Sequence, residues 1–122
     1  GTEVLIQPFL KEIEKDGEFS FVFFNKKYSH AMYKKPKQGE YRTHPDFGGI
    51  EDKFTPNSNL ILQAENILKS IESSLLYARV DTICVNEKLY LMELELTEPY
   101  LYFEFEENAP KSFVDAVKYY IF

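Results

Sequence analysis

Runs of β-branched and aromatic residues, interrupted by short polar turns, predict five strands along the chain. Four of these runs form two pairs, and a polar turn of the kind that is typical of a β-hairpin separates the members of each pair. A fifth run lies at the N-terminus. The expected strands are residues 3–7, 19–24, 28–33, 77–85 and 89–96, with turns at 25–27 and 86–88.

Two helices are predicted from apolar residues that recur at helical spacing. The first has Thr55 as its N-cap and Pro56 at the first helical position. Its apolar stripe comprises Leu60, Ala64, Ile67, Leu68, Ile71 and Leu75. The second begins at Asn108, and its apolar face comprises Phe113, Ala116, Val117 and Tyr120. Residues 35–54 are rich in Gly and Pro and predict a long loop, which in a compact domain is usually functional.

The order of these elements predicts an α+β fold in which a largely antiparallel sheet carries two packed helices. At 122 residues the chain fits one domain, which spans residues 1–122. Strongly apolar segments stand at both ends, so we expect the chain to be part of a longer protein.

Composition limits the classes of function. The net charge of -6 argues against nucleic-acid binding, which requires a basic surface that neutralises phosphates. No apolar run approaches the roughly 20 residues that span a bilayer, and the start does not resemble a signal peptide, so a cytoplasmic protein without a membrane partner is expected. Cys84 lies in an apolar run and is expected to be a buried, unreactive thiol.

Charged residues are segregated along the sequence. Six of the fourteen basic residues lie between positions 26 and 42, whereas six glutamates lie between positions 93 and 107. A basic wall that faces an acidic wall suits a metal–phosphate ligand, with cations for the phosphates and carboxylates for the metal. Two solvated faces of a sheet are the alternative interpretation.

The second predicted hairpin places charged side chains on one face. Because side chains alternate along a strand, Arg79 and Asp81 share a face that we expect to point to solvent. A turn centred on Glu87 places Asp81 opposite Glu93, and the same register places Arg79 opposite Glu95. Opposed carboxylates repel unless a cation lies between them, and Mg²⁺ prefers oxygen ligands. The alternative is an exposed acidic face with a cross-strand Arg79–Glu95 pair. The positions expected to face the core are Ala78, Val80, Thr82, Cys84, Tyr90, Met92, Leu94 and Leu96.

Arg79-Val80-Asp81, followed by Glu93-Leu94-Glu95, resembles the metal-binding core of the ATP-grasp superfamily, in which an R-x-D strand precedes an E-x-N strand. The branch it resembles most holds bacterial glutathione synthetases and ribosomal-protein glutamate ligases. The resemblance implies that the chain is the C-terminal part of an ATP-grasp fold. It also implies that Asp81, Glu93 and Glu95 hold Mg²⁺, or Mn²⁺ as a substitute, on the phosphates of ATP. Arg79 would contact phosphate or an acyl-phosphate, and Glu95 stands at the usual Asn position.

The N-terminal run also resembles this family. Residues 4–10 are similar to the strand and hinge whose backbone receives the adenine, and an acidic residue shortly afterwards stands where it can reach the ribose. The implied nucleotide-binding residues are Gln7, Phe9, Leu10 and Glu12, the last of them at the ribose.

A basic segment resembles the R-x7-R pattern of the family, with Lys34 and Arg42 eight residues apart and Gly48-Gly49 in the turn that follows. These two side chains would neutralise phosphate and the developing acyl-phosphate. The segment from Gly17 to Ser20 resembles the G-[DE]-x-R opening of a family strand, but Ser20 replaces the arginine.

The family implies an ATP-dependent ligase that phosphorylates a carboxylate and lets an amine attack the acyl-phosphate. Its partners would be small carboxylate and amine substrates and an N-terminal portion of the same chain, and a homo-oligomer is compatible with it. The present chain would then hold half of the site and be inactive alone. A noncatalytic module that buries its aromatic surface against a protein partner is the alternative, and a kinase-like relative is a third interpretation. His30 and His44 are expected to form hydrogen bonds rather than to bind zinc.

Overall fold

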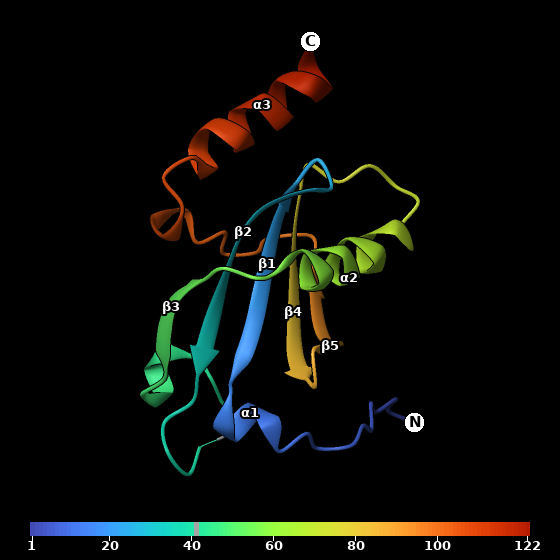
Figure 1. Cartoon of the computed structure of the whole chain (residues 1–122). Helices are drawn as coiled ribbons and strands as arrows, with labels where there is room; N and C mark the ends of the chain where they lie inside the picture. The colour runs from blue at the N-terminus through green and yellow to red at the C-terminus, as the bar shows by residue number, and fades with distance from the viewer. Residues whose placement is uncertain (41) are drawn as a thin grey trace.

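The computed structural model describes residues 1–40 and 42–122. Its strands are β1 (Glu18–Phe24), β2 (Lys27–Lys35), β3 (Ile50–Phe54), β4 (Tyr77–Val85) and β5 (Lys88–Glu95). Its helices are α1 (Glu12–Lys15), α2 (Ser58–Lys69) and α3 (Ala109–Ile121), with 3₁₀ turns at Pro45–Phe47 and Phe103–Phe105. The strands form one antiparallel sheet in the order β3-β2-β1-β4-β5 (Figure 1). This architecture confirms the predicted α+β class.

Both hairpins close with two-residue turns, one residue shorter than predicted. Asn25 and Lys26 have φ angles of 51° and 59°, and Asn86 and Glu87 have φ angles of 50° and 60°. Two successive left-handed residues make a type I′ turn, and Asn enters this conformation more readily than most residues because its short side chain can bond locally. The third residue of each predicted turn therefore begins a strand instead.

The second hairpin keeps the predicted charge pairs because a bulge compensates for the shorter turn. Arg79 lies opposite Glu95, as predicted. Asp81 likewise lies opposite Glu93. The register shifts just beyond Asp81, which makes Met92 the extra residue of β5.

The bulge also changes which residues of β5 face the core. Between the β4–β5 turn and the bulge, Leu89 is buried whereas Tyr90 is 40% exposed. The prediction that Tyr90 faces the core is therefore wrong. One extra residue reverses the alternation of side chains between the two faces of a sheet. On the other side of the bulge, Leu94 packs against the core as predicted.

The sheet carries an apolar core on each face. On the first face, α2 buries Leu60, Ala64 and Leu68 of its predicted stripe against β1, β2 and β4. On the second face, α3 and the segment before it pack against Val22 and Phe24 of β1. Figure 1 shows α2 across the sheet and α3 at the end of the sheet where β1 turns into β2.

The two long helices differ in how well their starts were predicted. The cap of α2 is Asn57, whose side chain accepts a hydrogen bond from the Leu60 N–H at 3.0 Å, so Thr55 is not the cap and Pro56 precedes the helix. An Asn at this extended position satisfies a free N–H of the first turn. Asn108 is the N-cap residue of α3, as predicted. Within the described residues, the helices are too short or too polar to cross a lipid bilayer.

Two further predictions of local structure are wrong. Residues 3–7 are not a strand, and Leu5 and Ile6 are largely exposed. A strand needs a neighbour for its N–H and C=O groups, and none of the described strands pairs with this segment. The predicted loop at 35–54 contains β3, which pairs with β2. Because β3 is an edge strand with charged residues, its sequence lacks the apolar alternation of a buried strand.

Candidate functional site

Charged side chains gather on the second face of the sheet, beside the core that α3 completes. Alternation along β4 places Arg79 and Asp81 on this face. The β1–β4 ladder adds Ser20, which lies opposite Asp81, and the β4–β5 ladder adds Glu93 and Glu95. We refer to Arg79, Asp81, Glu93 and Glu95 as the charged cluster.

Arg79 bonds to most of its neighbours in the charged cluster. Its Nε donates to Asp81 Oδ1 at 2.9 Å, and its Nη2 donates to Asp81 Oδ2 at 2.8 Å. Nη2 also donates to Glu95 Oε1 at 2.7 Å, and Nη1 donates to the Tyr100 carbonyl oxygen at 3.1 Å. Burial disfavours the charge of Arg79, but hydrogen bonding and attraction to Asp81 outweigh it and raise the pKa of the guanidinium. The predicted Arg79–Glu95 pair is therefore present, with Arg79 charged and fixed in orientation.

The charged cluster is more buried than predicted. Arg79 is 6% exposed and Asp81 is 1% exposed, so the expectation of a solvent-facing surface is wrong for β4. Tyr102 covers this region, and its ring centroid lies 5.5 Å from Arg79 Cζ and 5.3 Å from Lys34 Nζ. Its backbone is left-handed, with φ 51° and ψ 44°, which is uncommon for an aromatic residue. Its hydroxyl donates to Glu51 at 3.4 Å, which ties this cover to β3.

Three carboxylates of the charged cluster are placed to share a metal ion. One oxygen atom from each of Asp81, Glu93 and Glu95 lies within 4.8 Å of the other two. Ligands of an octahedral Mg²⁺ lie roughly 3 Å apart when neighbouring and roughly 4 Å apart when opposite, so small side-chain movements would close this set on one ion. Asp81 is buried, Glu95 is half-buried and Glu93 is exposed, so the set opens to solvent at Glu93. Burial raises the pKa of Glu95, against the opposing attraction of Arg79.

Lys34 and Glu18 extend the charge across β2 and β1. They lie opposite each other, with Lys34 Nζ 3.9 Å from Glu18 Oε1, and Lys34 lies buried in a strand rather than at the start of a loop. Burial, followed by repulsion from Asp81, raises the pKa of Glu18 to about 7. The site then holds two cations, Lys34 and Arg79, and four carboxylates. Its net charge is minus two when all four carboxylates, Glu18, Asp81, Glu93 and Glu95, are ionised.

Arg42 makes its described contacts within its own loop. Its Nε and Nη2 donate to the carboxylate of Glu40 at 3.0 and 2.7 Å. Its guanidinium also lies 3.8 Å from the ring centroid of Phe47. The structure thus brings Lys34 to the charged cluster but pairs Arg42 locally, and a phosphate contact by Arg42 stays a prediction.

The predicted nucleotide-binding residues lie at the N-terminus of the chain. Gln7 and Phe9 are exposed in the segment before α1, and Glu12 opens that helix. The carbonyl of Leu10 accepts the N–H of Ile13 at 3.2 Å. Contacts between these residues and a nucleotide stay a prediction.

Three residues of the site, namely Glu18, Ser20 and Tyr102, were not among the predicted site residues, although Glu18 and Ser20 lie in the segment that resembles the opening of a family strand. Ser20 Oγ donates to Asp81 Oδ1 at 2.6 Å. These two residues are 61 positions apart, so only the β1–β4 ladder reveals the contact. Tyr102 belongs to an aromatic stretch directly after the acidic motif, which was the one available signal for a cover over the site.

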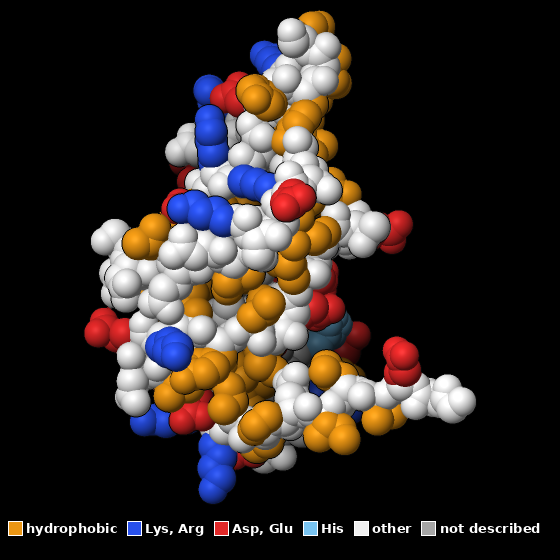
Figure 2. All heavy atoms as spheres, turned by 90° about the vertical axis from the view of Figure 1, so that its right-hand side faces the viewer, with side chains coloured by type: hydrophobic (Ala, Val, Ile, Leu, Met, Phe, Trp, Pro, Cys, Tyr) orange, Lys and Arg blue, Asp and Glu red, His pale blue; other side chains and the backbone are white. Residues whose placement is uncertain are grey.

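The outer side of the charged cluster is accessible. A shallow groove of about 350 Å³ follows residues 93–98. Figure 2 shows acidic side chains gathered at a hollow in the surface, next to the projecting N-terminal segment. A ligand could therefore approach the carboxylates from the β5 side.

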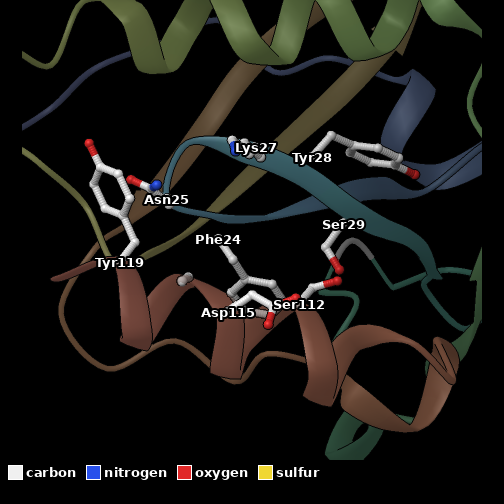
Figure 3. A pocket seen from close by; sticks show the side chains of 9 residues that line it. Phe24, Asn25, Lys27, Tyr28, Ser29, Ser112, Asp115 and Tyr119 are labelled. Atoms are coloured by element: carbon white, nitrogen blue, oxygen red, sulfur yellow. The ribbon is translucent and has the colours of Figure 1, made fainter. Parts of the chain in front are cut away.

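A second hollow of about 350 Å³ lies between the β1–β2 turn and α3 (Figure 3). Ser29 lines it from β2, and Ser112 and Asp115 line it from α3. Within the described chain, none of the predicted site residues lines it. Phe24, also in its lining, is four residues beyond Ser20 on β1, a span of roughly 13 Å, so this hollow is separate from the charged cluster.

Comparison with known proteins gives relatives of similar fold and greater length. No family model matches the chain. The cycloserine biosynthesis protein DcsG of Streptomyces lavendulae is 26% identical over 125 residues, which cover 96% of this chain and 42% of that protein. The crystal structure of D-cycloserine synthetase DcsG matches with a TM-score of 0.74 and 23% identity, over 95% of this chain and 42% of that one. D-alanine–D-alanine ligase from Bacillus anthracis, complexed with ATP, matches with a TM-score of 0.58 and 19% identity, over 84% and 36%.

These likenesses establish the fold of the chain. It corresponds to the C-terminal part of the ATP-grasp fold, as predicted. The chain spans less than half the length of each of these relatives. The narrower resemblance to glutathione synthetases and ribosomal-protein glutamate ligases stays a prediction.

Proposed function

We propose that this chain supplies the metal and phosphate side of the active site in a cytoplasmic, ATP-dependent carboxylate–amine ligase. The remainder of the site would come from an N-terminal portion of the same protein. The observation that carries the proposal is the charged cluster, in which three carboxylates lie close together and two of them bind a buried arginine on an ATP-grasp fold. Similarity to proteins named as a synthetase and a ligase, one of them complexed with ATP, supports it.

The donor atoms of the charged cluster suit Mg²⁺ or Mn²⁺. Both ions accept carboxylate oxygens, and Mg²⁺ commonly takes one or two carboxylates with phosphate and water in its other positions. Asp81, Glu93 and Glu95 supply oxygen atoms only. When Glu18 and these three carboxylates are all ionised, the excess of two negative charges matches one divalent cation. Such an ion, when bound, would neutralise phosphate oxygens and hold ATP in position.

Arg79 and Lys34 would stabilise negative charge on the transferred phosphoryl group. The guanidinium of Arg79 is planar, permanently charged and already oriented by Asp81. Lys34 adds a second charge from β2, two strands away from β4 in the sheet, and its ammonium group also lies near the ring of Tyr102. Positioning and charge stabilisation suffice for acyl-phosphate formation, so a nucleophilic side chain is not required. Arg42 would join them by exchanging Glu40 for phosphate.

The N-terminal segment would bind the nucleoside. The backbone at Gln7, Phe9 and Leu10 would receive the adenine, and Glu12 would accept a hydrogen bond from the ribose. Gln7 and Phe9 are exposed, which supports the role because a ligand can reach this segment. Small carboxylate and amine substrates would then meet beside the phosphates.

Calorimetric titration of the chain with ADP, with and without Mg²⁺, tests the proposal. Wild type is expected to bind ADP more tightly with Mg²⁺, and Asp81→Asn/Glu93→Gln is expected to lose this dependence. The matched control is Glu65→Gln/Glu72→Gln, which removes the same two charges on and after α2. If wild type gains nothing from Mg²⁺, or if the control fails as the site variant does, the proposed metal site is wrong.

One observation favours the alternative of a noncatalytic module. Among the described residues every buried side-chain nitrogen or oxygen has a partner, so the network around Arg79 is complete without a ligand. Exposed aromatic side chains, including Tyr100, Tyr119 and Phe122, would then face a protein partner. ADP and Mn²⁺ titrations that are flat for both wild type and the site variant would support this alternative.

A further inference from the structure

Ser20 occupies a buried position at the centre of the sheet, directly against the charged cluster. It lies opposite Asp81 in the β1–β4 ladder, and its side chain is 0% exposed. Its hydroxyl donates to Asp81 Oδ1 at 2.6 Å, a short bond of the kind formed with an ionised carboxylate. Ser20 thus touches one specific oxygen of the most buried carboxylate in the cluster.

The hydrogen bonds of Asp81 determine which of its oxygens is open to a cation. A carboxylate offers about four lone pairs, two on each oxygen. Among the described residues, Oδ1 accepts from both Ser20 Oγ and Arg79 Nε, whereas Oδ2 accepts only from Arg79 Nη2. One lone pair therefore remains, and it lies on Oδ2.

We infer that Ser20 is a positioning residue that restricts Asp81 to ligation through Oδ2 alone, and so favours small octahedral cations over Ca²⁺. This inference rests on the proposed function. Mg²⁺ and Mn²⁺ suit carboxylates that bind through one oxygen, whereas Ca²⁺ takes six to eight ligands and often binds both oxygens of a carboxylate. Removal of the hydroxyl frees a lone pair on Oδ1 and loosens the carboxylate. This change weakens binding of a cation through one oxygen and permits binding through both.

Mn²⁺ titration followed by electron paramagnetic resonance, with displacement by Ca²⁺, tests this role in the folded chain. Ser20→Ala is expected to weaken Mn²⁺ binding about tenfold, the scale of losses measured when a partner of a metal ligand is removed. It is also expected to lower the ratio of Mn²⁺ to Ca²⁺ affinity by about fivefold or more. The shift in this ratio is a readout that a loss of packing alone does not produce.

The matched control is Thr82→Val, which removes a buried hydroxyl on the other face of the same strand pair. Thr82 Oγ1 donates to the Phe19 carbonyl and does not touch Asp81. This variant is expected to keep the Mn²⁺ affinity and the ratio of Mn²⁺ to Ca²⁺ affinity within about twofold of wild type, because it leaves the metal ligands and their hydrogen-bond partners intact. Ser20→Cys, which keeps the volume but has a weak donor, is expected to shift both values in the same direction as Ser20→Ala but less.

The outcomes separate a failure of the Ser20 role from a failure of the proposed metal site. If wild type binds Mn²⁺ while folded Ser20→Ala and Ser20→Cys bind with unchanged affinity and unchanged ratio, the role of Ser20 is overturned and the metal site stands. An equal loss in Thr82→Val also overturns it, because the effect would then be general packing. If wild type does not bind Mn²⁺, the proposed function fails and the role of Ser20 fails with it.

Discussion

Removing the charge of Arg79 tests whether the charged cluster is a buried ion network. Arg79→Met keeps most of the aliphatic stem but deletes four donated hydrogen bonds, two to Asp81, one to Glu95 and one to the Tyr100 carbonyl. Asp81, at 1% exposed, would keep the bond from Ser20 as its one remaining side-chain hydrogen bond within the described residues. Breaking a buried pair by removing one partner costs about 3–5 kcal/mol. In urea unfolding, with a slope of about 1–3 kcal/mol per M, this corresponds to a fall in the midpoint of about 1–5 M.

The stability lost in Arg79→Met should be recovered when both charges are removed. Arg79→Met/Asp81→Leu leaves no unpaired buried charge on β4, and apolar replacement of a buried pair is often neutral or stabilising. We therefore expect the double variant to unfold at a higher urea concentration than Arg79→Met. Lys111→Met is the control, because its pair with Asp115 is exposed and should leave the midpoint unchanged. A midpoint for Arg79→Met equal to that of the control would refute the reasoning.

Three further predictions concern other parts of the site and fold. Glu18→Gln should flatten the pH dependence of stability. The folded-state pKa of Glu18 is raised from 4.5 to about 7, so the free energy of unfolding of wild type should fall as pH rises across this range. An equal slope in the variant, measured by urea unfolding between these pH values, would contradict the reasoning. Glu87→Gly should stabilise the chain by up to about 1 kcal/mol, because glycine adopts the φ of 60° without strain; a lower thermal midpoint would contradict this. Tyr102→Phe should barely change the thermal midpoint, because the hydrogen bond from the Tyr102 hydroxyl to Glu51 is long. Tyr102→Ala should cost about 3–5 kcal/mol of stability, by analogy with other buried aromatic residues. Similar thermal midpoints for Tyr102→Ala and wild type would count against the role of Tyr102 as a cover.

Local patterns were enough to place the second hairpin and its charges. Alternation along the strands and a short polar turn predicted that Asp81 faces Glu93, and the ladder confirms it. The agreement depends on two differences that cancel, because the turn is one residue shorter and Met92 is bulged. Tyr90 lies between the turn and the bulge, where the differences do not cancel, and its predicted face is therefore wrong.

The rest of the site depends on contacts between distant segments. Ser20 reaches Asp81 only because β1 pairs with β4 across the intervening β2, β3 and α2. Burial of Arg79 depends on Tyr102, in a segment whose aromatic residues carry no strand or helix period. Alternation shows which residues share a face, but the packing of later segments decides whether that face is wet.

The stability experiment on Arg79 and Asp81 also bears on why the charged cluster exists. A sheet of this kind could bury apolar side chains at both positions, and on the same face Val22, which lies opposite Arg79, and Phe24 do so. If Arg79→Met/Asp81→Leu folds at least as stably as wild type, the ion network is not required for the fold. Its carboxylates and guanidinium would then be explained by a ligand, and the loss of Mn²⁺ binding in that same folded variant would separate the chemistry of the cluster from its structure.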